Sequence, residues 1–344
     1  MTEPSLPPLL AELAAVQGGA WTRAQALACG ETAHTIRRHL RSAWCSPYPG
    51  VYVDRSQLQS VDAAGRHVLL AAARVLGSGL RPVVSHQSAA VCLELPVLGR
   101  LPAGPVLTRP PDGAATSSSS ANLKIAALPR RDWIRYRGVP VTSGERTVCD
   151  LARSVGLDAA VVTLDTALRR GLDDHALHDV VQRCSSWPGG TRIASVLAAA
   201  DPRAETPIES LTRLRYREFG LPEPVSQAQV FDPDGHEIGR VDFLFWQHGV
   251  VGDADGMLKY DREGALREEK RREQSFRRYG LEVLRNNWQE ALPGRSPEFR
   301  VRALQAFALA AGRPRARGLS YRVPPLAELR ALDARRGTLF RGST

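Results

Sequence analysis

Three aspartates lie in two neighbouring apolar segments that are expected to form strands. Asp242 interrupts the apolar run 241–246, and Asp253 and Asp255 belong to the following segment 250–256. A carboxylate inside a buried strand is costly unless it is paired or bound to a cation. Carboxylates with open coordination positions suit Mg²⁺ or Mn²⁺, which also bind phosphate oxygens. The pattern therefore predicts a divalent-cation site with Asp242 and Asp253 as metal ligands.

The turn between these strands decides whether the acids meet. Strand periodicity puts Asp253 and Asp255 on one face, and a two-residue turn at 247–248 places Asp242 directly opposite Asp253. A three-residue loop ending at Gly249 instead puts Asp242 on the other face unless a bulge corrects the register. Pairing of the acids with arginine is the alternative to a metal.

Further charged residues flank the aspartates and extend the candidate catalytic set. Glu209, on a helix expected before the strands, is a candidate fourth acid. Lys259 and Lys270 follow Asp255 within fifteen residues. A lysine near a metal-bound water can orient it or stabilise the charge that develops on phosphorus. The candidate catalytic residues are Glu209, Asp242, Asp253, Asp255, Lys259 and Lys270.

A second group of residues, near the N-terminus, suits nucleic acid. A helix expected over 32–40 turns Ile36 and Leu40 inward, which leaves its polar side chains for the other surface. Short helices followed by the strand 51–53 are the order of a winged helix-turn-helix, whose recognition helix needs donors for phosphates and base edges. The predicted DNA-binding residues are Arg23, Thr35, Arg37, Arg38 and Arg41. A three-helix unit with solvated arginines is the alternative.

The composition is that of an ordinary soluble protein with an excess of arginine. The 344 residues carry a formal net charge of +10, and only three of the 46 basic residues are lysines. Arginine suits phosphate recognition, but the basic excess is spread along the chain and codon usage also explains it. Neither a membrane span nor a secretory signal is expected, which predicts a cytoplasmic protein without a membrane partner. The five dispersed cysteines are expected to be free thiols.

The pattern of elements predicts a multidomain α+β protein. Helices are expected over 9–16, 23–29, 32–40, 68–76, 161–168, 208–219, 261–279 and 299–311. Strands are expected over 51–53, 105–108, 124–128, 133–136, 139–142, 225–231, 237–246, 250–254 and 281–285. The predicted segments are a winged helix-turn-helix at 1–55, a mixed α/β domain at 56–200, an endonuclease-like α-β-β-β-α-β domain at 201–311 and an Arg/Pro-rich tail at 312–344.

Several motifs resemble known families. Residues 21–53, with Thr22-Arg23-Ala24-Gln25-Ala26 and Pro49-Gly50-Val51-Tyr52, resemble the winged helix of AbiEi-type antitoxins. Ser85-His86-Gln87-Ser88 and Thr142-Ser143-Gly144-Glu145-Arg146-Thr147 resemble the middle region that accompanies it in actinobacterial proteins. Residues 208–288 resemble very-short-patch-repair endonucleases of the PD-(D/E)XK superfamily. That resemblance implies a restriction-endonuclease-like fold and a magnesium-dependent DNA endonuclease or nickase.

The resemblance assigns roles and also shows one departure. It places Glu209 and Asp242 at the first two acidic positions and Asp253 at the acid of the last motif. Asp255 stands where the superfamily has lysine, so Lys259 or Lys270 would be a migrated lysine. The alternative function is a non-catalytic antitoxin-like regulator with a degenerate nuclease fold. DNA is the expected partner in both cases. A homodimer stays open, as does a toxin partner for the regulator.

Overall fold

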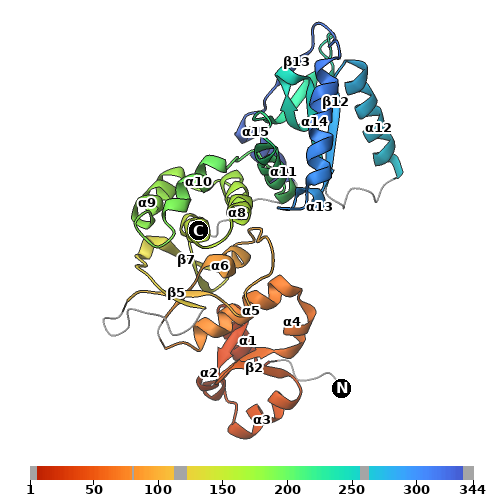
Figure 1. Ribbon diagram of the computed structural model, residues 1–344. Coiled ribbons are helices and arrows are strands. Elements are labelled where there is room, and N and C mark those ends of the chain that lie inside the picture. The colour runs from red at the N-terminus through yellow and green to blue at the C-terminus, as the bar shows by residue number, and fades with distance from the viewer. Residues whose placement is uncertain (1–5, 80, 112–121, 256–262, 336–344) are drawn as a thin grey trace. The chain divides into compact units, whose positions relative to one another are not determined.

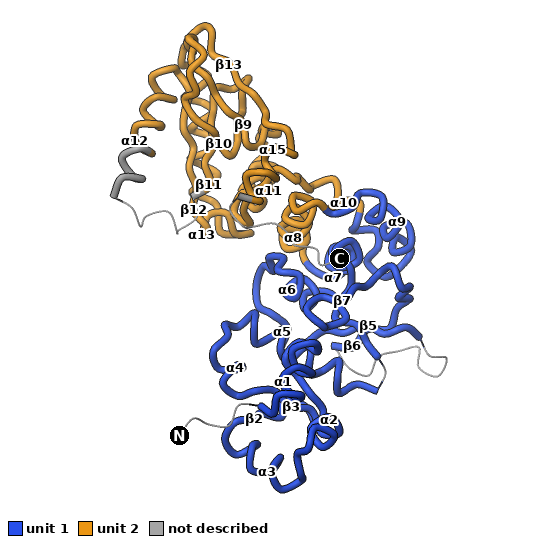
Figure 2. Tube along the Cα trace, turned by 180° about the vertical axis from the view of Figure 1, so that it is seen from behind, with its two compact units in different colours: residues 1–155, 172–193, 343–344 blue, residues 156–171, 194–342 orange. Residues whose placement is uncertain are grey.

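The computed structural model describes residues 6–79, 81–111, 122–255 and 263–335, and it is an α+β, multidomain protein. The chain divides into two compact units (Figure 2). Unit 1 holds 6–155 and 172–193 of the described residues, and unit 2 holds 156–171 and 194–335. None of the helices in these described ranges is both long and apolar enough to cross a bilayer.

The N-terminal part of unit 1 builds three helices and a three-stranded sheet of order β1-β3-β2 (Figure 1). Its elements are α1 (Pro8–Ala15), β1 (Ala20–Thr22), α2 (Arg23–Ala28), α3 (Ala33–Arg41), β2 (Trp44–Tyr48) and β3 (Val51–Asp54). Capping boxes fix the starts of the second and third helices, because Thr22 and Thr32 each bond the backbone N–H three residues on. The buried side chains of Trp21, Ile36 and Trp44 form the core between these elements.

The rest of unit 1 surrounds a second sheet, of order β6-β5-β4-β8-β7. Its strands are β4 (Val83–Val84), β5 (Leu107–Arg109), β6 (Leu123–Ile125), β7 (Trp133–Tyr136) and β8 (Val139–Thr142). Its helices are α4 (Arg55–Ser60), α5 (Ala63–Leu76), α6 (His86–Cys92), η1 (Arg130–Asp132, a 3-10 turn), α7 (Gly144–Ser154) and α9 (Asp174–Cys184).

A close backbone contact joins the two parts of unit 1. Gly138, in the turn between β7 and β8, has a left-handed backbone (φ 81°). A Cβ at this position would lie 2.2 Å from the carbonyl oxygen of Val16, just after α1. Glycine is therefore required here for both its conformation and its size.

Unit 2 is built on a five-stranded sheet of order β12-β11-β10-β9-β13. Its strands are β9 (Val225–Phe231), β10 (Glu237–Phe245), β11 (Val250–Asp255), β12 (Glu282–Asn287) and β13 (Ser320–Arg322). Its helices are α8 (Leu157–Arg169), α11 (Pro207–Glu218), η2 (Trp246–His248, a 3-10 turn), α12 (Glu263–Arg278), α13 (Trp288–Ala291), α14 (Pro297–Ala311) and α15 (Leu326–Arg335); α10 (Thr191–Ala199) spans the boundary between the units.

Helices cover both faces of this sheet. On one face, Tyr216 of α11 contacts Phe243 and Phe245 of β10, and Phe299 of α14 contacts Tyr216. On the other face, Phe276 of α12 joins the buried cluster that includes Leu244 and Val251. The alternation of strand side chains thus gives each helix layer its own apolar surface.

The C-terminal segment expected as a tail contributes to unit 2. Strand β13 pairs antiparallel with β9, and α15 follows it. Leu329 of α15 is fully buried, and Asp333 forms an ion pair with Arg169 of α8. The arginines and prolines of this segment do not show which residues form the strand and the helix. Residues 336–344 lie outside the described part.

Candidate acidic site and nucleic-acid surface

A row of polar side chains crosses four neighbouring strands of unit 2. Strands β10 and β11 pair with Phe243 opposite Gly252 and Phe245 opposite Val250, so one step further Asp242 stands opposite Asp253. The β9–β10 register likewise puts Gln227 opposite Asp242, and β11 pairs Asp253 with Arg285 of β12. Of the two registers that the sequence left open, the structure therefore has the one in which the two aspartates share a face.

The connection between β10 and β11 differs from the predicted turn. The chain forms η2 and then Gly249, whose backbone is left-handed (φ 68°). Four residues thus join Phe245 to Val250, rather than the two that were expected. Because two and four are both even, Asp242 lies on the same face of the sheet with either connection.

Asp242 is held by groups from both adjacent strands. One carboxylate oxygen accepts a 2.8 Å hydrogen bond from the Ala254 backbone N–H, and the other accepts a 3.4 Å bond from the Gln227 amide. Gln227 is fully buried, and its backbone is left-handed (φ 57°), a conformation rare for a non-glycine residue. Its amide oxygen is buried without a hydrogen-bond partner. The structure thus holds the Gln227 amide beside Asp242 at a conformational cost.

Glu209 is joined to this row, but its carboxylate is engaged in local structure. It accepts hydrogen bonds from the Glu205 backbone (2.8 Å), the Thr206 hydroxyl (2.7 Å) and the Gln227 amide (2.8 Å). Burial and the nearby Asp242 carboxylate raise the pKa of Glu209 to about 8. The helix N-terminus and Gln227 therefore hold an acid whose ionisation is costly.

Asp253 already has a cationic neighbour. Its side chain is 8% exposed and accepts a 2.9 Å bond from Arg272 of α12, while Arg285 lies 4.0 Å away. Sequence reasoning missed both arginines and Gln227. The strand register, which brings residues 227, 242, 253 and 285 into one row, identifies Gln227 and Arg285, and the packing of α12 brings Arg272 to Asp253.

The remaining predicted catalytic residues are less well placed. Lys270 is exposed on α12. Lys259 lies outside the described residues, and of Asp255 only the backbone, paired with Asn287, is described. Glu209, Asp242 and Asp253 do not bring three ligand oxygens within 4.8 Å of one another. The residues described therefore supply an acidic pair with a neighbouring acid, not a preassembled three-carboxylate site.

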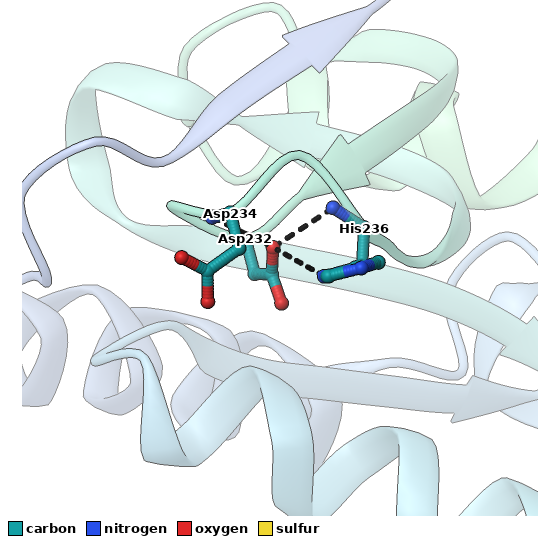
Figure 3. Close-up of side chains that lie close together, drawn as sticks. All are labelled: Asp232, Asp234 and His236. Atoms are coloured by element: carbon teal, nitrogen blue, oxygen red, sulfur yellow. Dashed lines mark hydrogen bonds and ion pairs between the residues drawn. The ribbon is translucent and has the colours of Figure 1, made fainter.

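The described residues do contain one compact group of metal-ligand types, in the turn between β9 and β10 (Figure 3). Asp232, Asp234 and His236 form it. One Asp232 oxygen accepts from the backbone N–H groups of Asp234 and His236, at 3.0 and 2.9 Å. These bonds close the turn predicted at 232–235, and Asp234 and His236 are exposed. The group is explained as an aspartate-capped turn.

The predicted DNA-binding arginines share one property. Ile36 is fully buried, and His39 stacks on Trp44 with ring centroids 4.7 Å apart, which turns the remaining face of α3 outward. The exposed basic side chains on this face and at the start of α2 make no hydrogen bond or ion pair with any described residue: Arg23, Arg37, Arg38 and Arg41. Thr35 differs, because its hydroxyl accepts from the Thr32 backbone in the capping box.

The arginines of unit 2 are used differently. Arg213 bonds Asp165 at 2.8 Å, and Arg215 bonds Asp158 at 2.8 Å, which ties α11 to α8. Arg169 joins Glu205 and Asp333. Much of the arginine excess therefore holds unit 2 together, whereas the arginines of α3 are available to an external anion.

No protein-family model matches the chain, and no curated protein matches it.

Proposed function

We propose that the protein binds DNA through its N-terminal region and hydrolyses phosphodiester bonds in unit 2 with a divalent cation. The register that sets Asp242 opposite Asp253, with Gln227 and Arg285 in the same row, carries this proposal. The residues fit a hard cation, because two carboxylates and the orphan amide oxygen of Gln227 are oxygen ligands.

The order of elements in unit 2 supports the same proposal. Helix α11, the antiparallel strands β9, β10 and β11, helix α12 and the parallel strand β12 follow one another. This is the α-β-β-β-α-β order of the PD-(D/E)XK fold inferred from the sequence. In that fold Glu209, Asp242 and Asp253 correspond to the acidic positions, and very-short-patch-repair endonucleases are the proposed relatives.

The mechanism assigns separate roles to these residues. Asp242 and Asp253 would hold Mg²⁺ or Mn²⁺, which when bound activates water and stabilises the leaving oxygen. Gln227 positions Asp242, and Glu209 positions Gln227. Arg272 and Arg285 line the same row from α12 and β12 and would face the negative charge of the scissile phosphate. Lys270 is a further candidate donor on α12.

The nuclease proposal is tested with plasmid DNA and either cation, comparing the native protein with Asp242→Asn. We expect the native protein to nick or cut, and the substitution to lower the rate by roughly a hundredfold or more because a metal ligand is lost. Asp234→Asn, an exposed acid of the β9–β10 turn, is the matched control and should cut normally. Equal cutting by the Asp242 variant would reject the site.

The N-terminal region would deliver this site to DNA. The order α1-β1-α2-α3-β2-β3 is that of a winged helix-turn-helix, with α3 as the recognition helix and β2–β3 as the wing. Arg37, Arg38 and Arg41 lie on its outward face and have no hydrogen-bond or ion-pair partner among the described residues. AbiEi-type antitoxins are the proposed relatives of this part.

DNA binding is tested by titrating a labelled duplex of the DNA upstream of the gene at several salt concentrations. Arg38→Ala combined with Arg41→Ala should weaken binding and reduce the salt slope by about two, because each phosphate contact releases a counterion. Arg66→Ala combined with Arg100→Ala removes two exposed arginines elsewhere in unit 1 and should change neither. If the salt slope falls equally in the Arg38/Arg41 and the Arg66/Arg100 double variants, the weaker DNA binding would come from net charge alone.

A non-catalytic DNA-binding regulator is the second candidate. The Arg272–Asp253 contact of 2.9 Å favours it, because this carboxylate is neutralised without a metal. The aspartate at position 255, where the superfamily has lysine, favours it as well. Sequence-dependent DNA binding without cutting under either cation would support the regulator.

A further inference from the structure

A cavity of about 450 Å³ in unit 1 brings together two sequence motifs to which the proposed function gives no role. His86 comes from the Ser85-His86-Gln87-Ser88 motif at the start of α6, and Arg146 and Asp150 come from α7, which the second motif begins. Lys124 of β6, Arg153 of α7 and Trp187 also line the cavity.

The charges around the cavity are predominantly positive. Lys124, Arg146 and Arg153 line it, against the single carboxylate of Asp150. Asp150 forms ion pairs with both Arg146 (3.0 Å) and Arg153 (3.1 Å), so two arginines share one negative charge. Behind the lining, Asp132 is shared by Arg146 and Arg183. The lining alone therefore carries an excess of about two positive charges.

Arg146 keeps part of its guanidinium unused. Its side chain is completely buried, with Nε on Asp150 and Nη1 on both Asp132 and the Ala127 carbonyl. Nη2 is buried with no hydrogen-bond partner, and the guanidinium lies 4.7 Å from the centre of the Trp187 ring. An unsatisfied buried donor is costly and indicates a missing acceptor.

His86 adds a neutral donor. Ser85 Oγ accepts a 2.7 Å bond from Thr108 and lies 2.9 Å from His86 Nδ1. The arrangement that satisfies all three groups has Ser85 donating to Nδ1, which places the ring proton on Nε2. Burial lowers the pKa of His86 and keeps the ring neutral, and Nε2 makes no hydrogen bond with a described residue. The backbone of His86 is left-handed (φ 54°), which indicates strain at this position.

We propose that this cavity, lined by His86, Lys124, Arg146 and Arg153, binds a small phosphomonoester, of which inorganic phosphate is the minimal form. A phosphomonoester is nearly a dianion at neutral pH, which matches the excess of two charges, whereas a carboxylate supplies only one. The planar guanidinium of Arg146 suits phosphate oxygens, and a cavity of about 450 Å³ leaves room for the rest of the ligand. This site is independent of the acidic row of unit 2.

Calorimetric titration of the full-length protein at constant ionic strength tests the site, with inorganic phosphate, adenosine monophosphate, adenosine and acetate as probes. We expect binding of one phosphate per chain, tighter binding of the monophosphate, and no measurable binding of adenosine or acetate. Equal affinities for phosphate and the monophosphate would identify free phosphate as the ligand.

Variants then locate the binding. Lys124→Ala should weaken phosphate binding roughly fivefold, the loss expected for one partly exposed charge contact. Arg66→Ala removes an exposed cation of unit 1 that lies outside the cavity and has no ion-pair partner among the described residues, so phosphate binding should not change. His86→Asn, which tolerates a left-handed backbone, should weaken binding without unfolding the protein. Absence of phosphate binding, or equal loss in the Lys124 and Arg66 variants, would overturn the proposal.

Discussion

At the scale of single residues, the acidic row depends on groups that strand patterns do not reveal. The alternation of apolar residues located Asp242 and Asp253, but only the observed strand register decides that they share a face. The alternation did not indicate Gln227, because the role of this residue follows from a left-handed backbone inside a strand. Nor did it indicate Arg272, because the contact to Asp253 joins residues 19 positions apart on a helix and a strand. Side-chain partners of this kind depend on tertiary packing, which a single sequence does not specify.

Glu209 gives a residue-scale prediction about pH. The folded-state pKa of about 8 lies above the ordinary value of 4.5, so the folded protein binds this proton more tightly than the unfolded chain. The resulting stabilisation is complete below about pH 4.5 and is lost as the pH rises through about 8. Between pH 7 and pH 9 the loss should be about 1.4 kcal/mol.

Urea unfolding of the native protein and of Glu209→Gln at pH 7 and pH 9 measures this effect. The native protein should lose about 1.4 kcal/mol more than the variant over this interval. Burial raises the pKa of Asp165 to about 6, so this group is already largely ionised at pH 7. It therefore contributes little to the change in stability between pH 7 and pH 9. Parallel losses in the two proteins would show that Glu209 ionises normally.

At the scale of elements, the boundaries followed from capping and turn residues. Thr22 begins α2 as predicted, and the Asp232-Pro233-Asp234-Gly235 turn separates β9 from β10. The strands predicted over 225–231, 133–136 and 139–142 have these bounds in the structure. Local hydrogen bonds decide such features, which explains why the sequence was informative. The packing of α8 on α11 was not predicted, because its central contact joins Asp165 to Arg213, 48 positions away.

That contact yields an element-scale prediction. Asp165 and Arg213 are both buried, and Arg213 also bonds the Ala199 carbonyl. Arg213→Met should lower the free energy of unfolding by about 3–5 kcal/mol, because it leaves a buried carboxylate without its partner. Adding Asp165→Leu should recover much of the loss, since the unpaired charge is then removed. Denaturant unfolding of the single and double variants measures both effects; additive losses would mean that the pair is not coupled.

At the scale of the whole molecule, the units are not consecutive segments of the chain. The chain passes between them after Val155, after Gly171 and after Ile193. As a result α8 belongs with α11 and the five-stranded sheet of unit 2, although it precedes the expected boundary near residue 200. The composition and the positions of glycine and proline do not indicate that the chain enters unit 2 at 156–171 and then goes back to unit 1 at 172–193.

This connectivity predicts how truncation affects unit 2. A fragment beginning at 201 lacks the Asp158, Asp165 and Arg169 side chains that pair with α11, Glu205 and α15. A fragment beginning at 156 keeps them and should melt at a clearly higher temperature, as followed by circular dichroism. Equal melting of the two fragments would contradict a role for α8 in the stability of unit 2.

The contact between Gly138 and Val16 limits how the N-terminal region can be exchanged between proteins. A bulkier residue in the β7–β8 turn would collide with the backbone after α1. The first helix and this hairpin are therefore matched surfaces, although more than a hundred positions separate Val16 from Gly138. A chimaera that transplants only residues 1–55 would break that match, so the β7–β8 hairpin must be inherited together with the N-terminal region.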